Sequence, residues 1–309
     1  MDKKVVVIGA SNIDIKGKSR TKTFSKTKNP GIVEFSPGGV ARNIAENLAR
    51  LNINSILLSV IGNEGFADLL INSTKNAGVD VSRLLKCERN SGIFLAIINS
   101  RGELDASISD MGIMSNITPE YIRSNLDIIK ESNYIVVDAD IPDQTLLEIL
   151  SISQKYSIPI CVEPVSPSRA HNIQNYMKGV TLTTPNKEEL ESLVNRQITD
   201  EKDIEEATED LLKMGVENII VTLGSEGAYC ASKTFKGFIP SVRTMVINSV
   251  GAGDALVAGT IAGLMDGESF DNSVKLGIAC ATITITDEKA VSEKLTKEKA
   301  MEIARKITC

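Results

Sequence analysis

The sequence of 309 residues has no tryptophan, a single histidine (His171) and no pair of cysteines in C-x-x-C spacing. Its five cysteines are odd in number and scattered, which is typical of reduced thiols rather than of a disulfide framework. Serine–histidine catalysis, cysteine–histidine catalysis and histidine-rich zinc sites would all depend on one residue in a polar stretch. These absences favour chemistry carried by carboxylates, amides and backbone groups.

An excess of basic residues and long apolar runs are also absent. The formal net charge is -6, which argues against binding to nucleic acid or to an anionic membrane surface. No apolar run approaches the length needed to span a bilayer, and the first one, residues 5–8, is too short for a signal peptide. We therefore expect a cytoplasmic protein with neither nucleic acid nor membrane among its partners.

Two common nucleotide-binding motifs are missing. The chain has no G-x-x-x-x-G-K-[ST], which excludes a P-loop NTPase, and no G-x-G-x-x-G after its first strand. Any nucleotide must therefore be bound by another arrangement of backbone groups.

Short apolar runs alternate with segments of helical periodicity along most of the chain. The expected strands are 4–10, 55–61, 134–138, 158–162, 180–183, 218–222, 227–231 and 235–239. The expected helices are one that opens at 36–39 and runs to about Leu51, one after Asn186, and 65–77, 143–156, 201–214, 252–266, 270–285 and 296–306. This alternation predicts an α/β fold with a mostly parallel central sheet and helices on both faces.

The alternation breaks at residues 91–110, where the pattern predicts a β-hairpin of mixed polarity with its turn at 100–102. Residues 32–35 form another expected strand, and 16–31, rich in Lys, Ser and Thr, are expected to be a loop. We expect a small β lid from about 16–37 and 90–112, inserted in one domain spanning 1–309.

Residues 248–254, NSVGAGD, precede a helix of small apolar residues. A helix N-terminus favours an anion, yet Asp254 would lie beside it. A carboxylate that removes a proton from a hydroxyl, while amides hold a phosphoryl group, would account for both. A glycine-rich turn that only caps the helix is the alternative.

Asn12 and Asp14 alternate with Ile13 and Ile15, so an extended backbone would place both polar side chains on one face. They could bind the hydroxyls of a sugar. The alternative is a strand-end turn, where Asn and Asp are common.

Four segments, in order along nearly the whole chain, resemble the motifs of the ribokinase-like PfkB carbohydrate kinases. They are GGVARN at 38–43, NKEE at 186–189, TLGSEG at 222–227 and VGAGD at 250–254. The resemblance implies the ribokinase-like three-layer α/β/α fold, a kinase reaction, and ATP and Mg²⁺ as cofactors. In this family the lid often pairs with that of a second chain, so a homodimer through the lid is expected.

The resemblance also implies a role for individual residues. Asp254 would be the catalytic base, and the amides of Gly251, Ala252 and Gly253 would stabilise the phosphoryl group. The sugar would be bound by Asn12, Asp14, Gly38, Gly39 and Asn43. Asp110 of the lid is a candidate for contact with the heterocyclic base of the substrate. The nucleotide would be bound by Asn186, Thr222, Gly224 and Gly227, and Glu189 would act on the metal through a water molecule.

Within the family, segments 29–31, 37–45 and 248–251 are similar to those of bacterial pseudouridine kinases. This implies phosphorylation of the 5'-hydroxyl of pseudouridine, with ribose or another nucleoside as alternative substrates. A catalytically inactive sugar-binding regulator is a further alternative, although Asp254 and its glycines are retained. Asn248-Ser249 replaces the family's common Asp-Thr, which leaves a monovalent cation undecided, and Glu163 replaces an Asp before Pro164.

Overall fold

The computed structural model describes residues 3–21 and 27–308. Its main sheet has eight strands, and all neighbouring pairs from β12 to β4 are parallel, whereas β13 is antiparallel to both of its neighbours. Across the sheet the strands are β14 (Lys236–Ile239), β13 (Ala228–Ser232), β12 (Asn218–Thr222), β11 (Leu182–Thr183), β10 (Ile160–Glu163), β9 (Tyr134–Asp138), β1 (Lys4–Ile8) and β4 (Asn54–Leu58). The predicted mostly parallel sheet is confirmed.

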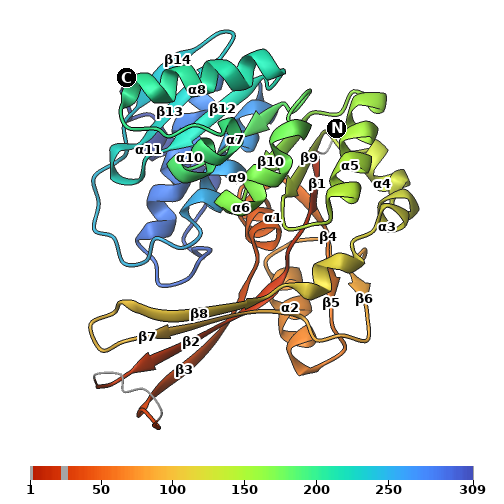
Figure 1. Ribbon diagram of the computed structural model, residues 1–309, viewed down its shortest axis with the longest axis vertical. Helices are drawn as coiled ribbons and strands as arrows, with labels where there is room; N and C mark the ends of the chain where they lie inside the picture. Colours follow the sequence, from red (N-terminus) through yellow and green to blue (C-terminus); the bar gives the residue numbers. More distant parts are fainter. Residues whose placement is uncertain (1–2, 22–26, 309) are drawn as a thin grey trace.

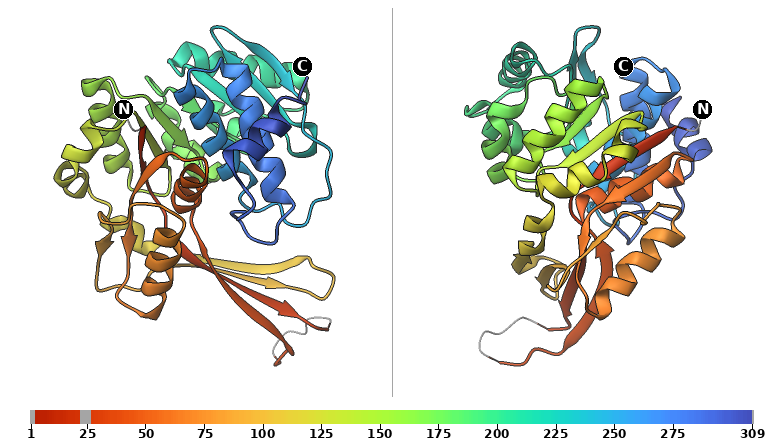
Figure 2. Two further views of the ribbon diagram at one scale, coloured as in Figure 1. Left: turned by 180° about the vertical axis from the view of Figure 1, so that it is seen from behind. Right: turned by 90° about the vertical axis from the view of Figure 1, so that its right-hand side faces the viewer.

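Alternate side chains of the central strands enter two separate cores, because successive residues of a strand point to opposite faces. In β1, Val5 and Val7 pack into one core and Val6 and Ile8 into the other. The first core includes residues of α1 (Val40–Arg50), α9 (Ala252–Asp266), α10 (Phe270–Ile285) and α11 (Lys297–Ala304). The second includes residues of α3 (Pro119–Ser124), α4 (Leu126–Lys130), α5 (Asp143–Tyr156), α6 (Pro167–Ile173), α7 (Lys187–Val194) and α8 (Glu201–Met214). The sheet is thus the middle layer of a three-layer α/β/α fold (Figures 1 and 2).

A second, four-stranded sheet projects from the main body (Figure 1). Its strands are β3 (Gly31–Gly38), β2 (Asn12–Ser19), β7 (Gly92–Ile98) and β8 (Leu104–Asp110), in that order. The hairpin expected at 91–110 is present as β7 and β8. The remaining short elements are β5 (Val60–Ile61), β6 (Leu85–Lys86), α2 (Gly65–Asn76), η1 (Gly112–Asn116), η2 (Gln174–Tyr176) and η3 (Gly224–Glu226).

The projecting sheet departs from the prediction at its first two strands. Residues 16–19 continue β2 and residues 36–38 complete β3, so the expected loop and the expected helix start were wrong there; α1 begins at Val40. The loop was expected because charged residues interrupt the apolar pattern of these strands. In the structure these charges lie on a half-exposed face, where Lys18 forms an ion pair with Glu34 at 2.8 Å. Residues 22–26 of the expected lid lie outside the described residues.

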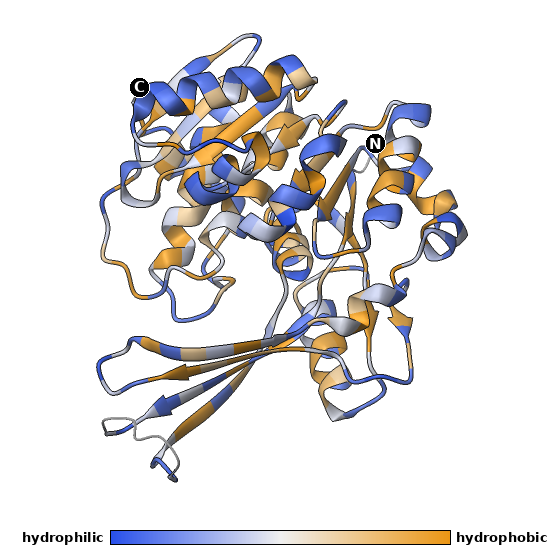
Figure 3. Cartoon of the chain, viewed as in Figure 1, coloured by the Kyte–Doolittle hydropathy of each residue, from blue (hydrophilic) through white to orange (hydrophobic). Residues whose placement is uncertain are grey.

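The two faces of the projecting sheet differ in polarity. Cross-strand partners share a face, which places Ile15, Phe35, Leu95 and Ile108 on one side. Asp14 lies on the other side together with its partner Ser36. Helix α2 covers part of the apolar side, with the rings of Phe35 and Phe66 5.5 Å apart. Figure 3 shows this mixture of hydrophilic and hydrophobic residues along the projecting strands, in contrast to the hydrophobic main sheet. Within the described residues, no helix has the length and apolarity needed to cross a bilayer.

Candidate active site

The segment after β1 brings two of the predicted sugar-binding side chains together. Asn12 and Asp14 lie on β2, and Asn12 Nδ2 donates a hydrogen bond to Asp14 Oδ1 at 2.8 Å. Gly38 is paired with Asn12 across β3, and a Cβ atom there would lie 2.6 Å from the Asp14 carboxylate oxygens. Burial raises the pKa of Asp14, although the bond from Asn12 opposes this. The site therefore holds a partly desolvated carboxylate with an oxygen free to accept from a ligand.

Gly39 precedes the first residue of α1 and allows this helix to start close to the turn after β1. Its φ of 101° lies in the region that side chains rarely adopt, and a Cβ atom would lie 2.4 Å from Ala10 O. One turn later, Asn43 Nδ2 donates to Asp254 Oδ2 at 2.8 Å. This bond joins residues 211 positions apart and places the 38–43 and 250–254 motifs in one site.

The turn at Gly251 forms the N-terminus of α9. Gly251 has a φ of 83°, and a Cβ atom on it would lie 1.9 Å from Ala290 O. Within the described part of the chain, no acceptor is paired with the amides of Gly251 and Gly253, whereas the Ala252 amide donates to Ser249 O at 3.3 Å. Gly253 is exposed, with open space around it. The turn therefore offers unpaired N–H groups at a helix N-terminus, the arrangement that binds anions.

Asp254 lies in the first turn of α9, where burial raises the pKa of its carboxyl to about 7. Asp14 raises this pKa further, while the hydrogen bond from Asn43 and the charge of Arg42 lower it. A carboxyl with a pKa near neutrality is suited to accept a proton during a reaction and to release it afterwards.

Asp138 is a buried carboxylate that the sequence analysis did not select. Its Oδ2 accepts hydrogen bonds from Ala10 N at 2.7 Å and from Ala41 N at 3.0 Å. It therefore fixes the start of α1 against the turn after β1. Burial, followed by the charge of Asp140, raises its pKa to about 7. The signal in the sequence was an acid at the end of an otherwise apolar strand.

The predicted nucleotide-binding residues lie at the ends of β11 and β12. Asn186 and Thr222 form a parallel bridge, and both line a cavity of about 670 Å³ together with Gly224. Gly227 lies at the end of η3, where a Cβ atom would be 2.2 Å from Ile239 O. Three of the four predicted residues thus face one cavity, and the fourth connects their loop to β13.

Asn186 and Glu189 bind each other at the start of α7. Asn186 Oδ1 accepts from Glu189 N, and Glu189 Oε2 accepts from Asn186 N, both at 2.9 Å. This reciprocal capping box leaves the other carboxylate oxygen of Glu189 available. Burial raises the pKa of Glu189.

Glu163, at the end of β10, lies near Glu189. Burial, then the charge of Glu189, raises the pKa of Glu163 well above its usual range, and Asp254 adds to this effect. Within residues 3–21 and 27–308, no group of three or more acidic, histidine or cysteine side chains is placed to hold a metal. The neighbouring carboxylates of Glu163 and Glu189 and the side-chain oxygen of Asn186 nevertheless fit Mg²⁺. This ion binds one or two carboxylates and completes its shell with water and phosphate oxygens.

Asp110 is not brought into the same group of side chains. It is paired with Ile93, which places it on the Ile13 side of the sheet, and its Oδ1 accepts from Gly112 N at 3.2 Å. Its neighbour Met111 is closer: the Met111 sulfur lies 2.9 Å from the position that a Cβ atom would take on Gly92, the partner of Asn12.

Comparison with known proteins finds related kinases along the whole chain. The profile of the pfkB family carbohydrate kinases matches residues 2–297. The pseudouridine kinase of Escherichia coli (strain K12) is 30% identical over 307 residues, which cover 99% of this chain and 97% of that protein. The guanosine-inosine kinase of Exiguobacterium acetylicum is 27% identical, over 94% of this chain and 98% of that protein. The structure of a carbohydrate kinase from Agrobacterium tumefaciens superposes with a TM-score of 0.87 at 25% identity, covering 99% of this chain and 98% of that one.

Proposed function

Because the chain belongs to the pfkB family of carbohydrate kinases, we propose that it transfers a phosphoryl group from ATP to the 5'-hydroxyl of a ribonucleoside, pseudouridine. The observation that carries this proposal is the contact of Asn43 with Asp254, which joins a sugar-binding motif to a candidate base at an anion-binding helix N-terminus. Phosphotransfer to a hydroxyl group follows from family membership. The choice of nucleoside is supported by the similarity to pseudouridine kinase and by the matching segments around the motifs.

In this reaction the 5'-oxygen attacks the γ-phosphorus while Asp254 takes the hydroxyl proton. The bond from the γ-phosphorus to the bridging oxygen breaks, and ADP leaves. Unpaired amides of Gly251 and Gly253 donate to the transferring phosphoryl oxygens, with Ala252 as the third amide of the turn. The product is a nucleoside 5'-phosphate.

The ribose is held at the start of β2 and α1. Asp14 accepts from two neighbouring hydroxyls, Asn12 and Asn43 donate to or accept from the sugar, and Gly38 and Gly39 allow the ring to approach the backbone. Asp110 is the weakest member of this set, because its carboxylate faces Gly112. It stays the candidate for contact with the base of the nucleoside, although it lies on the face of the lid opposite Asp14.

ATP binds along Asn186, Thr222, Gly224 and Gly227, at the 670 Å³ cavity. Asn186 and Glu189 would hold Mg²⁺, Glu189 through a water molecule, and a bound ion would supply positive charge to offset that of the phosphates. A monovalent cation is not assigned. Asn248, which replaces the family's common Asp, donates through Nδ2 to Glu288 O at 2.8 Å in the loop beside Gly251.

We assign residues 1–309 to a single kinase domain with an inserted lid, about 16–37 and 90–112, whose described part includes most of the projecting sheet. Its polar face carries Asp14 and would cover the sugar, which excludes water as a competing acceptor. Its apolar face carries Val33 and Ile108, which are 59% and 66% exposed. These side chains support a homodimer in which the lids of two chains pack together.

The proposal is tested by measuring ATP consumption with pseudouridine, uridine, guanosine, adenosine, ribose and fructose 6-phosphate in the presence of Mg²⁺. A kcat/KM for pseudouridine at least tenfold above that for uridine is expected. Preference for ribose or guanosine would contradict pseudouridine as the substrate and leave the kinase activity in place. Guanosine is the second candidate substrate, because the chain is similar to a guanosine-inosine kinase. Binding of a nucleoside without turnover of any compound would instead favour an inactive sugar-binding regulator.

A further inference from the structure

Arg42 is a charged side chain inside the protein, in the first turn of α1. Only 5% of it is exposed. Its Nε donates to Thr74 Oγ1 at 3.3 Å, one terminal nitrogen donates to Asn43 Oδ1 at 3.1 Å, and the other donates to Glu46. A buried guanidinium is costly unless its donors are paired. Here the three nitrogens have three different partners, so the planar group has one orientation.

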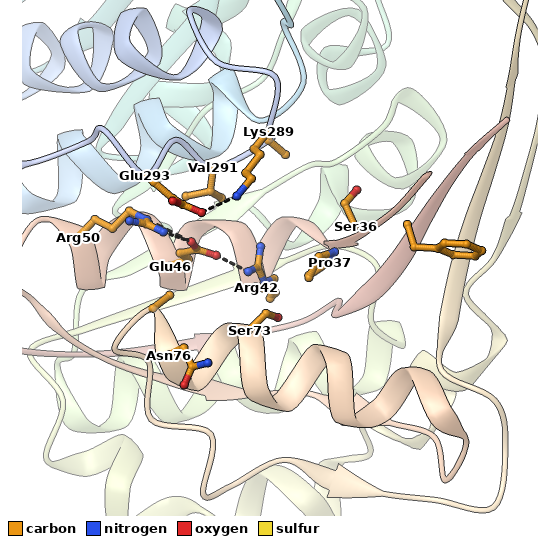
Figure 4. A pocket seen from close by; sticks show the side chains of 13 residues that line it. Ser36, Pro37, Arg42, Glu46, Arg50, Ser73, Asn76, Lys289, Val291 and Glu293 are labelled. Carbon is orange, nitrogen blue, oxygen red and sulfur yellow. Dashed lines mark hydrogen bonds and ion pairs between the residues drawn. The ribbon is translucent and has the colours of Figure 1, made fainter. Parts of the chain in front are cut away.

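The position of Arg42 is also set by the next turns of its own helix. Figure 4 shows Glu46 between Arg42 and Arg50 along α1, at a cavity of about 680 Å³ between α1, α2 and the segment around Lys289. Arg50 forms an ion pair with Glu46 at 2.6 Å. Glu46 therefore anchors both arginines, but only Arg42 also reaches Asn43.

The contact with Arg42 determines which way the amide of Asn43 points. A side-chain amide has a donor end and an acceptor end. Since the oxygen accepts from Arg42, the nitrogen faces Asp254 and donates to it. If the amide were turned, its oxygen would face the carboxylate, and two acceptors would meet without a proton between them.

We propose that Arg42 is a positioning residue that fixes the orientation of Asn43 and, through it, holds Asp254 as a hydrogen-bond acceptor ready to take a proton. This inference rests on the proposed function, in which Asp254 is the base. Among the described residues, the hydrogen-bond partners of Arg42 are Thr74, Asn43 and Glu46, and not Asp254.

The charges around Asp254 give this role a measurable consequence. Asp14 on β2 and Glu163 at the end of β10 are the neighbouring acids, and Arg42 on α1 is the neighbouring cation. Without Arg42, Asp254 keeps both acids as neighbours and loses a fixed donor. The base would then ionise only at higher pH.

The test compares Arg42→Met with Arg50→Met, which removes the other partner of Glu46 and leaves Asn43 untouched. With whichever substrate the wild type phosphorylates, we expect Arg42→Met to lower kcat about 10- to 100-fold at pH 7, as is usual when a group that orients an active-site residue is removed. KM should stay within about threefold, and the acidic midpoint of the pH–rate profile should rise by roughly one pH unit. Arg50→Met should change neither by more than about twofold.

A double variant shows whether Arg42 acts through Asn43. Arg42→Met combined with Asn43→Ala should lose no more activity than Asn43→Ala alone, whereas multiplied losses would overturn the inference. Equal pH profiles for Arg42→Met and Arg50→Met would overturn it as well.

Two further variants keep the outcomes separate. If circular dichroism shows that Arg42→Met is unfolded, Arg42→Lys replaces it: the charge beside Glu46 is kept, the planar contact with Asn43 is lost, and the midpoint should rise in the same direction. An unshifted midpoint in folded Arg42→Lys would then reject the inference. Full turnover by Asp254→Asn would reject the base of the proposed function instead, whatever Arg42 does.

Discussion

The carboxyl group of Asp254 is partly buried and receives one hydrogen bond from Asn43. Replacement by Asn keeps the shape and removes the proton acceptor. We expect Asp254→Asn to lower kcat about 10²- to 10⁴-fold, the range for loss of a general base, while nucleoside affinity measured by calorimetry changes little. Asp266→Asn, at the other end of α9, serves as the control. Loss of binding with turnover preserved would remove Asp254 from the catalytic role.

The pH dependence of the reaction follows from the same group. A base must be ionised to accept a proton, and burial raises the pKa of Asp254 to about 7. We therefore expect log kcat/KM to rise with slope one at acidic pH and to reach a plateau above about pH 7. The measurement is initial rates from pH 5 to 9 at saturating ATP. A flat profile between pH 5 and 8 would mean that Asp254 is not the proton acceptor of the rate-limiting step.

In the turn before α9, the backbone conformation and the space available require a glycine at position 251 but not at position 253. A Cβ atom on Gly251 would lie 1.9 Å from Ala290 O, and its φ of 83° is unfavourable for other residues. On Gly253 a Cβ atom would meet nothing within 4 Å. Gly251→Ala should therefore lower the free energy of unfolding by about 1–3 kcal/mol, whereas Gly253→Ala, inside α9, should raise it by up to about 1 kcal/mol. Equal melting temperatures for the two variants would show that the loop at Ala290 yields.

The helices and central strands could be predicted from the sequence because each has one periodic apolar pattern. α5, α8 and β9 lie at the residues expected for them. The strand expected at 32–35 is part of β3. The length of β2 could not be predicted, because Lys16 and Lys18 interrupt its pattern while its backbone is paired on both sides. A strand with one charged face resembles a polar loop.

The sequence motifs identified most of the residues of the candidate site, but not the contacts between them. Arg42 was passed over because its partner Thr74 lies on another helix, which its own segment does not indicate. Asp138 ends an apolar strand, but its partners Ala10 and Ala41 come from distant parts of the chain. Residue spacing identifies which side chains share a helix face, and tertiary packing decides which of them lose contact with water.

For the whole molecule, the buried acids make stability depend on pH. Asp138 and Asp254 have pKa values of about 7, above those expected in the unfolded chain. Between the unfolded and folded pKa values the folded state binds more protons, so the free energy of unfolding falls as pH rises. We expect urea unfolding to give a lower stability at pH 7.5 than at pH 5, and a smaller difference in Asp254→Asn. Greater stability at pH 7.5 would show that these carboxyl groups are already ionised at pH 5.

The lid links substrate binding to dimer formation in our proposal, because its two faces would contact different partners. The Asp14 face is polar and would meet the sugar, whereas Val33 and Ile108 expose apolar surface on the other side. A charge at Ile108 should weaken pairing of two lids and leave the polar face intact. We expect sedimentation velocity to show a dimer for the wild type and a monomer for Ile108→Lys. The control Leu147→Lys, which changes an exposed leucine on α5, should stay dimeric.

If a monomeric Ile108→Lys kept full kcat with a raised KM, pairing would serve to hold the lid near the sugar rather than to build the catalytic centre. A monomeric wild type would mean that the apolar face has a different partner.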